Sequence, residues 1–373
     1  MSDVKYRLVT RSDFDGLVCA VLLHELQLID EIAFAHPKDM QDGKVAITAR
    51  DITANLPFVP GAHLVFDHHE SETVSNAGRR DINHIIDASA PSAARVIFNH
   101  YGGKAAFPRV SDDMMAAVDQ ADSAQYTRED ILSPQGWVLL SYLMDSRTGL
   151  GRFKEFRISN YALMMDLIQY CRDHTIDEIL ALPDVQERVA LYKEHATKAR
   201  EQILHCGICI DKLLVLDMRE EETIWATNRF MVYALFPQAT VSVQVVWGLK
   251  KQNTALAAGK SILNRSSNAH LGNLMLEFGG NGHADAGDCQ VPNDKADQVL
   301  QALVQRITVA GWAFFVRPIR LSRARRAFHP RASSGQGLET PQPAHNCRLP
   351  VLAGAGSSPA THISLIPTRE KPP

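Results

Sequence analysis

Short apolar segments alternate with amphipathic ones along the first third of the chain. Residues 5–10 have the pattern of a strand and residues 16–28 that of a helix. Further strands are expected at residues 31–36, 45–49 and 63–66, and a further helix is expected to begin at Pro91 and Ser92 and end at Gly102 and Gly103. Strands that alternate with helices predict an α/β layer fold with a largely parallel sheet.

The 373 residues are enough for two domains and additional segments. The first domain is expected over residues 1–158. Residues 159–205 show only helical patterns, with capping-box spacing at Thr175 to Glu178 and at Asp184 to Glu187, and predict a helical connector. Residues 206–312 then predict a second, smaller α/β domain.

The last segment, residues 313–373, differs from the rest in composition. Arg, Pro, Ser and Gly dominate it, and Glu339 and Glu370 are its acidic residues. Such a segment buries too little apolar surface to offset its ordering entropy, so we expect a disordered basic tail. The alternative is a basic arm that binds nucleic acid.

Composition limits the classes of protein that need to be considered. The formal net charge of −3 argues against strong non-specific affinity for long duplexes. No apolar run approaches the roughly 18 residues of a membrane span, and Asp13 and Asp15 interrupt the region where a signal peptide would be apolar. Six cysteines with a single CxxC, at Cys206 and Cys209, indicate reduced thiols rather than a disulfide framework. We expect a cytoplasmic protein without a membrane partner; homodimerisation is left open.

Acidic residues and histidines follow three of the expected strands. They are Asp13 and Asp15, then Asp51, then the run Asp67, His68 and His69. The carboxyl ends of parallel strands share one edge of a sheet, so these side chains are expected to meet there. Two carboxylates about 4 Å apart repel by roughly 4 kcal/mol at an effective dielectric near 20, and a divalent cation reverses the sign.

The ligand types indicate which ion would be preferred. Carboxylate oxygens with imidazole suit Mn²⁺, with Mg²⁺ or Co²⁺ as alternatives, better than they suit a thiolate-rich zinc site. Each cluster alone is a weak signal, because an Asp after a strand is commonly a turn former or a helix cap. The three clusters in this order are together a much stronger one.

These residues resemble a known family. Asp13-x-Asp15, Asp51, the literal Asp67-His68-His69 and the downstream run from Gly279 to Gly287 resemble the DHH phosphoesterases with their DHH-associated C-terminal domain. The resemblance covers roughly residues 5–307, and its two signatures occur in the right order. The family includes single-strand exonucleases, nanoRNases, cyclic-dinucleotide phosphodiesterases, exopolyphosphatases and, with a different C-terminal domain, family II pyrophosphatases.

The resemblance implies a site with two metal ions. Asp51 would bridge them, with Asp13 binding one ion and Asp15 and His68 binding the other. Two such ions activate a water and stabilise an in-line displacement at phosphorus. Many members carry a His four residues before the first Asp, where this chain has Val9, so the first ion is expected to be weakly held or absent until substrate arrives.

The remaining roles implied at the site concern neighbours of the ions. Asp67 would orient His68, and His69 would face the substrate phosphate or leaving oxygen as a charge stabiliser or proton donor. The last acidic ligand is open between Asp122, which we prefer, and Asp145. Arg11, two residues before Asp13, would contact a phosphate.

A glycine-rich run is expected to form the substrate-binding part of the second domain. Its members are Gly279, Gly280, Gly282 and His283. Glycines let the backbone approach a phosphate or sugar closely, and Asn281 is the other residue type that tolerates positive φ. By resemblance, His283 and Arg265 would hold the far end of the substrate, with Arg265 in bidentate fashion.

The sequence therefore predicts a metal-dependent phosphoesterase. Short single-stranded oligoribonucleotides are the preferred substrates, followed by polyphosphate or a small nucleotide such as a cyclic dinucleotide. Loss of hydrolysis in Asp51→Asn is expected. The alternative function is a non-catalytic nucleotide-binding or sensor module on the same scaffold.

Overall fold

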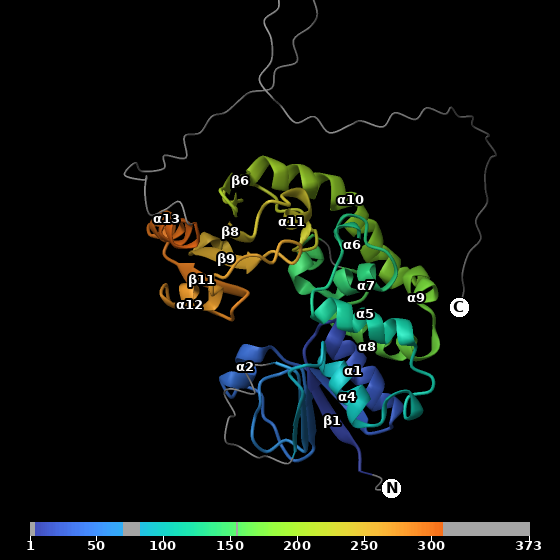
Figure 1. Cartoon of the computed structure of the whole chain (residues 1–373). Helices are drawn as coiled ribbons and strands as arrows, with labels where there is room; N and C mark the ends of the chain where they lie inside the picture. Colours follow the sequence, from blue (N-terminus) through green and yellow to red (C-terminus); the bar gives the residue numbers. More distant parts are fainter. Residues whose placement is uncertain (1–3, 70–82, 154–155, 309–373) are drawn as a thin grey trace, which may run out of the picture. The chain divides into compact units, whose positions relative to one another are not determined.

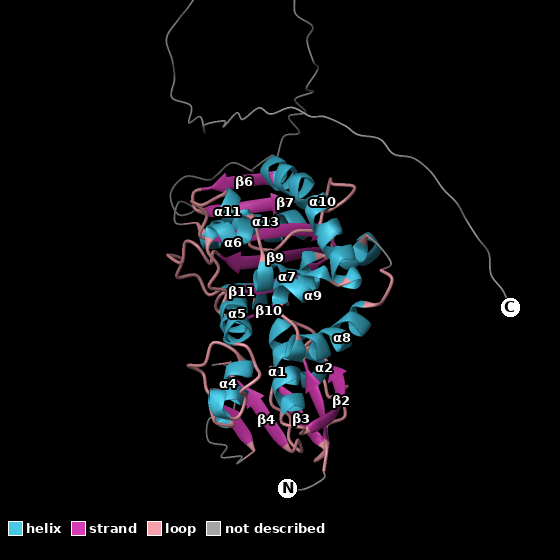
Figure 2. Ribbon diagram, turned by 90° about the vertical axis from the view of Figure 1, so that its right-hand side faces the viewer, coloured by secondary structure: helices cyan, strands magenta, loops and turns pink. Residues whose placement is uncertain are grey.

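The computed structural model describes residues 4–69, 83–153 and 156–308 (Figure 1). An entirely parallel five-stranded sheet forms the first part, in the order β2-β1-β3-β4-β5. Its strands are β1 (Tyr6–Thr10), β2 (Ile29–Phe34), β3 (Asp51–Ala54), β4 (Leu64–Asp67) and β5 (His84–Ile86). Figure 2 labels β2, β3 and β4 of this sheet. The predicted α/β class with a parallel N-terminal sheet is confirmed.

Helices alternate with the strands of this sheet and follow them along the chain. They are α1 (Phe14–Glu25), α2 (Pro37–Gln41), α4 (Ala93–His100), α5 (Asp112–Asp122), α6 (Arg128–Leu132) and α7 (Gly136–Met144), with short 3₁₀ turns at Gly103–Ala105, Ser146–Thr148 and Leu150–Arg152. Helix α1 is buried from Phe14 to Leu23. Gly16 is required near its start, because a Cβ there would lie 2.0 Å from the Arg11 carbonyl oxygen. The turn that follows β1 is therefore held tightly against α1.

The segment predicted as a helical connector holds three helices: α8 (Asn160–Asp173), α9 (Ile176–Ala181) and α10 (Pro183–Cys206). The capping box of Thr175 and Glu178 is confirmed. The second predicted box, at Asp184, is wrong, because α10 already begins at Pro183 with Leu182 as its N-cap. Proline suits the first helical position, since its φ is already helical and its missing N–H is not needed there.

A second sheet of six strands has the order β10-β11-β9-β8-β7-β6 and is antiparallel except for the β7–β8 pair. Its strands are β6 (Gly207–Ile210), β7 (Leu213–Asp217), β8 (Val241–Trp247), β9 (Thr254–Lys260), β10 (Asn281–Gly282) and β11 (Ala286–Val291). The associated helices are α11 (Met231–Leu235), α12 (Leu271–Leu276) and α13 (Ala296–Ile307), with a 3₁₀ turn at Leu249–Lys251. Alternate residues of β8 are buried, as a sheet with one core face requires.

Two expectations need a correction or a limit. The strand predicted at residues 45–49 is wrong, because the third strand is β3, which begins at Asp51. All four residues of β3 are buried in a central strand of the sheet. Of the two neighbouring apolar segments, 45–49 and 51–54, burial in the sheet therefore selected the second. The predicted tail at residues 313–373 lies outside the described residues. No helix in the described part of the chain has the length and apolarity needed to cross a bilayer.

Candidate active site

Asp13 and Asp15 lie where β1 gives way to α1. Asp13 is the N-cap of α1, and its Oδ1 accepts a hydrogen bond from the Gly16 N–H at 3.0 Å. Asp15 is 2% exposed, and its two oxygens accept from the N–H groups of Ala93 and Ala94 at 3.0 and 2.8 Å. These donors begin α4, so a second helix fixes the Asp15 carboxylate.

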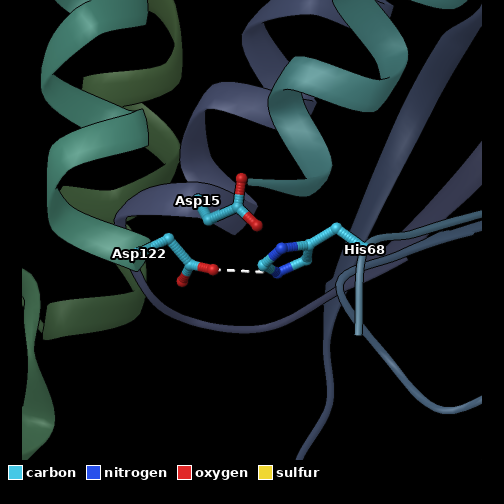
Figure 3. A group of neighbouring side chains, drawn as sticks. All are labelled: Asp15, His68 and Asp122. Carbon is cyan, nitrogen blue, oxygen red and sulfur yellow. Dashed lines mark ion pairs between the residues drawn. The ribbon is translucent and has the colours of Figure 1, made fainter. Parts of the chain in front are cut away.

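His68 and Asp122 complete a compact group with Asp15 (Figure 3). His68 follows the end of β4, and Asp122 is the last residue of α5. The His68 Nε2 lies 2.8 Å from Asp122 Oδ2, and one ligand atom from each of the three residues lies within 4.8 Å of the other two. Asp122, which the sequence favours over Asp145 as the last acidic ligand, therefore lies beside His68, and its role as a ligand stays a prediction.

The carboxylates of this group favour protonation of His68. Burial opposes that protonation, but Asp122, Asp15 and Asp67 outweigh it and raise the pKa of His68 to about 9. Burial and the charge of Asp122 raise the pKa of Asp15 to about 7, although His68 opposes this. Burial also acts on Asp122, but His68 holds its pKa below the usual value. The imidazolium thus performs the neutralising role that a divalent cation would have.

The donor set fits a divalent cation. Two carboxylates and an imidazole are ligands that Mn²⁺ and related ions accept. The His68 Nε2 atom is buried and has no well-aligned hydrogen-bond partner among the described residues, despite its closeness to Asp122. Its other ring nitrogen, Nδ1, lies 3.3 Å from the Ala90 carbonyl oxygen, which sets the ring orientation. Nε2 is therefore the ring atom available to a metal.

Asn55 belongs to this edge of the sheet, and the sequence analysis missed it. It follows the last residue of β3, is 1% exposed, and its Nδ2 lies 3.4 Å from Asp13 Oδ1. Its Oδ1 is buried without a hydrogen-bond partner among the described residues. Its φ of 56° is one that Asn tolerates. The strand-like Ile52 to Ala54, ending shortly before Pro57, was the signal that could have placed Asn55 here.

Asp51 does not lie with these residues. As the first residue of β3 it stands at the amino end of the strand, roughly 13 Å along the chain direction from Asn55. Its Oδ1 accepts from Arg7 Nε at 2.7 Å, and its Oδ2 accepts from the N–H and hydroxyl of Thr48 at 2.6 and 2.9 Å. The expectation that Asp51 follows a strand and bridges two ions is therefore wrong.

Asp67 orients His69 rather than the His68 ring. Its Oδ1 accepts from His69 Nδ1 at 2.7 Å and from the His68 backbone N–H at 2.8 Å. With Nδ1 engaged, Nε2 is the free nitrogen of His69, whose side chain is 40% exposed. The role predicted for His69 stays a prediction, whereas the expected Asp67 bond to the His68 ring is not formed.

Three other residues singled out in the sequence have ordinary partners. Val9 is fully buried in a small apolar cluster and offers no metal ligand. Arg11 Nε lies 3.1 Å from Asp13 Oδ2 and neutralises that carboxylate. Asp145 Oδ1 accepts from Arg147 Nε at 2.7 Å.

The glycine-rich run packs against α12. Gly279 has a φ of 74° and Gly282 one of 151°, whereas Asn281 lies in β10 without positive φ, contrary to expectation. A Cβ on Gly272 of α12 would lie 2.6 Å from the Gly282 carbonyl carbon, and one on Gly280 would lie 2.0 Å from a backbone oxygen of β11. These glycines permit close backbone packing between α12, β10 and β11.

His283 and Arg265 differ in how they are held. His283 is exposed on the whole, but desolvation of its ring lowers its pKa. The charge of His69 lowers it further. Arg265 donates to the carbonyl oxygens of Ile262 and Ala124, both at 3.1 Å. Ala124 follows closely after Asp122, so Arg265 contacts the segment that carries this carboxylate. Asp13, Asp15 and Asp122, with His68 beside them, are called the acidic group below.

A parallel sheet whose carboxyl edge gathers carboxylates, an imidazole and a second histidine with a free Nε2 has the features of a metal-dependent phosphoester hydrolase. The chain is 58% identical to a pGpG-specific phosphodiesterase, PggH, from Vibrio cholerae, with a TM-score of 0.72 over 81% of this chain and 99% of that one. RecJ of Thermus thermophilus in complex with Mn²⁺ is 12% identical, with a TM-score of 0.40 over 82% of this chain and 53% of that one. CDC45 of Entamoeba histolytica is 9% identical, with a TM-score of 0.41 over 81% and 95%.

No family model and no curated protein matches the chain. The likeness to the Vibrio enzyme nevertheless spans nearly all of that chain at high identity. The chain belongs to the DHH phosphoesterase family, and it is a phosphoester hydrolase. The predicted family and enzyme class are thereby confirmed.

Proposed function

We propose that this enzyme hydrolyses the phosphodiester bond of linear dinucleotides and that pGpG is its preferred substrate. The identity of 58% over 99% of a pGpG-specific phosphodiesterase carries this proposal. The notation pGpG describes a dinucleotide with one internal phosphodiester and one terminal phosphate. It is a short member of the oligonucleotide class expected from the sequence, so longer RNA, polyphosphate and cyclic dinucleotides become the comparison substrates.

A divalent cation is proposed at the group of Asp15, His68 and Asp122, with Asp13 and Asn55 as additional oxygen donors. Mn²⁺ is our first choice, with Mg²⁺ or Co²⁺ as alternatives, and the second ion remains a prediction. When bound, the cation withdraws charge from phosphate oxygens and makes phosphorus more open to attack by water. Displacing the proton from His68 is part of binding, because the ligand nitrogen must be neutral.

The chain's own residues then account for the rest of the reaction. Water adds its oxygen to phosphorus, and the bond from phosphorus to the 3′ oxygen of the first nucleoside breaks. That oxygen needs a proton, which His69 supplies from Nε2, since Asp67 engages Nδ1 at 2.7 Å. The products from pGpG are two molecules of guanosine 5′-monophosphate, so the atoms balance with one water consumed.

A hydrolysis assay tests the proposal. Purified protein with Mn²⁺ is incubated with pGpG, a five-residue RNA, cyclic di-GMP, pyrophosphate and polyphosphate, and products are separated by chromatography. We expect pGpG to give the highest kcat/KM. The proposal fails if pGpG is not converted or if another of these compounds is converted faster.

A pair of variants on one helix serves as the site control. Asp122→Asn removes a proposed ligand and should lower kcat at least about 100-fold, together with Mn²⁺ affinity in calorimetry. Asp119→Asn, three residues earlier, removes a carboxylate whose partners are Arg95 and Ser92. It should affect stability rather than metal binding. Equal metal affinity in the two variants would remove Asp122 from the site.

Two expectations about the whole protein stay predictions. A cytoplasmic location was inferred from composition, and homodimerisation was left open. Analytical ultracentrifugation of the purified chain determines the second, and fractionation of cells that express it determines the first.

A further inference from the structure

Two arginines beside the acidic group have donor nitrogens that the described residues leave unused. Arg147 spends its Nε on Asp145 at 2.7 Å, and its terminal nitrogens make no hydrogen bond with the described residues. Arg229 has no carboxylate within 4.0 Å and no side-chain hydrogen bond in that part of the chain; its guanidinium lies 4.5 Å from the centre of its neighbour's ring, Phe230. Both side chains are exposed.

A backbone hydrogen bond holds the two segments together. The Thr227 N–H donates to the Thr148 carbonyl oxygen at 3.2 Å, so the bond lies one residue after Arg147 and two before Arg229. Thr148 is 2% exposed and Asn228 is 2% exposed. The arginines therefore extend from firmly packed backbone.

Asn228 explains why the second segment is rigid. Its Nδ2 donates to the Ile131 carbonyl oxygen and to the Tyr192 hydroxyl, both at 3.0 Å, and its Oδ1 accepts from the Phe230 N–H at 3.1 Å. These bonds use all of its amide in the buried interior. They fix the backbone that carries Arg229.

The two guanidinium groups interact electrostatically with the carboxylates of Asp13 and Asp122 but lie more than 4.0 Å from them. The charges of Asp13 and Asp122 reach Arg147, and the charge of Asp122 reaches Arg229. Arg229 also influences His283 of the glycine-rich run. The backbone bond of Thr227 to Thr148 places Arg229 near Arg147, and Arg229 lies more than 4.0 Å from every described carboxylate.

This position is electrostatically unfavourable for a cation on its own. Desolvation of the Arg229 guanidinium lowers its pKa to about 10, and the charge of Arg147 contributes to this lowering. The group is still protonated at pH 7, so two positive charges repel each other there. A bound phosphate would relieve the repulsion, because planar guanidinium donors match its oxygens.

We propose that Arg147 and Arg229 together bind the substrate phosphate that is not cleaved, which in a linear dinucleotide is the terminal one. The inference rests on the proposed function, because it takes the acidic group as the place of the scissile phosphate. It deepens that function by assigning a preference for dinucleotides that carry a terminal phosphate. Asp145 is then a positioning residue, since it holds Arg147 through Nε and leaves the terminal nitrogens directed elsewhere.

Paired substrates test the inference. kcat/KM is measured for pGpG and for GpG, which lacks the terminal phosphate, in the parent protein and in Arg147→Gln and Arg229→Gln. Each variant should lose roughly 10- to 100-fold on pGpG and little on GpG, because a hydrogen bond to a charged group is lost only with the first substrate. Arg229→Lys keeps the charge but not the planar pair of donors, so it should lie in between.

A matched control separates this role from general electrostatics. Arg306→Gln removes a positive charge from α13, where Arg306 binds Glu277, and should leave the ratio of the two kcat/KM values unchanged. Thermal unfolding of each variant checks folding. An equal loss on both substrates in Arg147→Gln and Arg229→Gln would assign the arginines to the scissile phosphate or to stability and overturn the inference; no loss on either would overturn it too.

Failure of the proposed function is distinguishable from failure of this inference. If the parent protein cleaves neither dinucleotide, the proposed function fails, and calorimetry then compares binding of pGpG and GpG. Tighter binding of pGpG that disappears in Arg229→Gln would still support the arginine pair. Equal affinity for both, or binding of neither, would overturn it.

Discussion

The Asn55 amide nitrogen lies 3.4 Å from Oδ1 of Asp13, at the carboxyl edge of the parallel sheet. The acid of the same strand, Asp51, lies at its other end and pairs with Arg7. The third strand therefore presents an amide, and not a carboxylate, to the proposed metal site. This arrangement lowers the negative charge that the site must tolerate when no cation is bound.

Replacing Asn55 tests its contribution to metal binding. Asn55→Ala removes an unpaired buried oxygen and should weaken Mn²⁺ binding roughly tenfold in calorimetry. Asn55→Asp should bind Mn²⁺ more tightly, because a carboxylate is the stronger ligand. With a chelator present, its free energy of unfolding should be lower than that of the parent protein, because the new carboxylate lies beside Asp13. Unchanged affinity in both variants would exclude Asn55 from the site.

Asp51→Asn should retain catalysis, in contrast to what the sequence alone predicted. Its effect should be on stability, with a loss of about 1–3 kcal/mol at pH 7, since Arg7 loses a partner. Burial acts to raise the pKa of Asp51, but Arg7 and Thr48 outweigh it and hold the pKa below its usual value.

The sign of the pH dependence follows from that shift. Stabilisation by Asp51 is fully present above the unfolded pKa of about 3.9 and is lost as the pH falls through the lower folded value. Chemical denaturation at pH 7 and near pH 3 should therefore show a difference between the variant and the parent that narrows in acid. A large loss of kcat with normal stability would return Asp51 to the active site.

His69 should act on the leaving oxygen. His69→Ala is expected to lower kcat on pGpG about 100-fold or more with little change in KM, and Asp67→Asn should give a smaller loss because it only orients the ring. The control is a p-nitrophenyl ester of guanosine 5′-monophosphate, whose leaving group needs no proton. If both substrates lose equally in His69→Ala, proton donation is not its role.

Gly272→Ala should disturb the glycine-rich run. The new Cβ would lie 2.7 Å from the Gly282 oxygen and from the His283 nitrogen, so the run must shift. We expect KM for pGpG to rise roughly tenfold, with an overpacking cost of about 1–3 kcal/mol in unfolding. Gly43→Ala is the control, because its Cβ would have no neighbour within 4 Å and only its φ of 68° resists. An unchanged KM in Gly272→Ala would separate this run from substrate binding.

Local patterns in the sequence predicted much of the fold. The alternation of segments gave the α/β class, Thr175 and Glu178 gave a capping box, and Asp67-His68-His69 marked the end of a strand. These features succeed because hydrophobic periodicity and capping depend on residues within a few positions of each other. The prediction failed at residues 45–49, where two neighbouring apolar segments compete and only burial in the sheet centre selects one.

The sequence by itself determined that acids and histidines follow parallel strands, and so predicted that they gather at one edge of the sheet. Tertiary structure alone decided its membership: Asp122 lies 2.8 Å from His68 from a helix 54 positions away, Asn55 takes the place expected of Asp51, and Thr227 bonds Thr148 to bring Arg229 beside Arg147. Strand register and long-range packing set these distances. Spacing along the chain encodes neither of them. A shift of a few residues in the register of one strand changes which of its side chains lie at the carboxyl edge of the sheet.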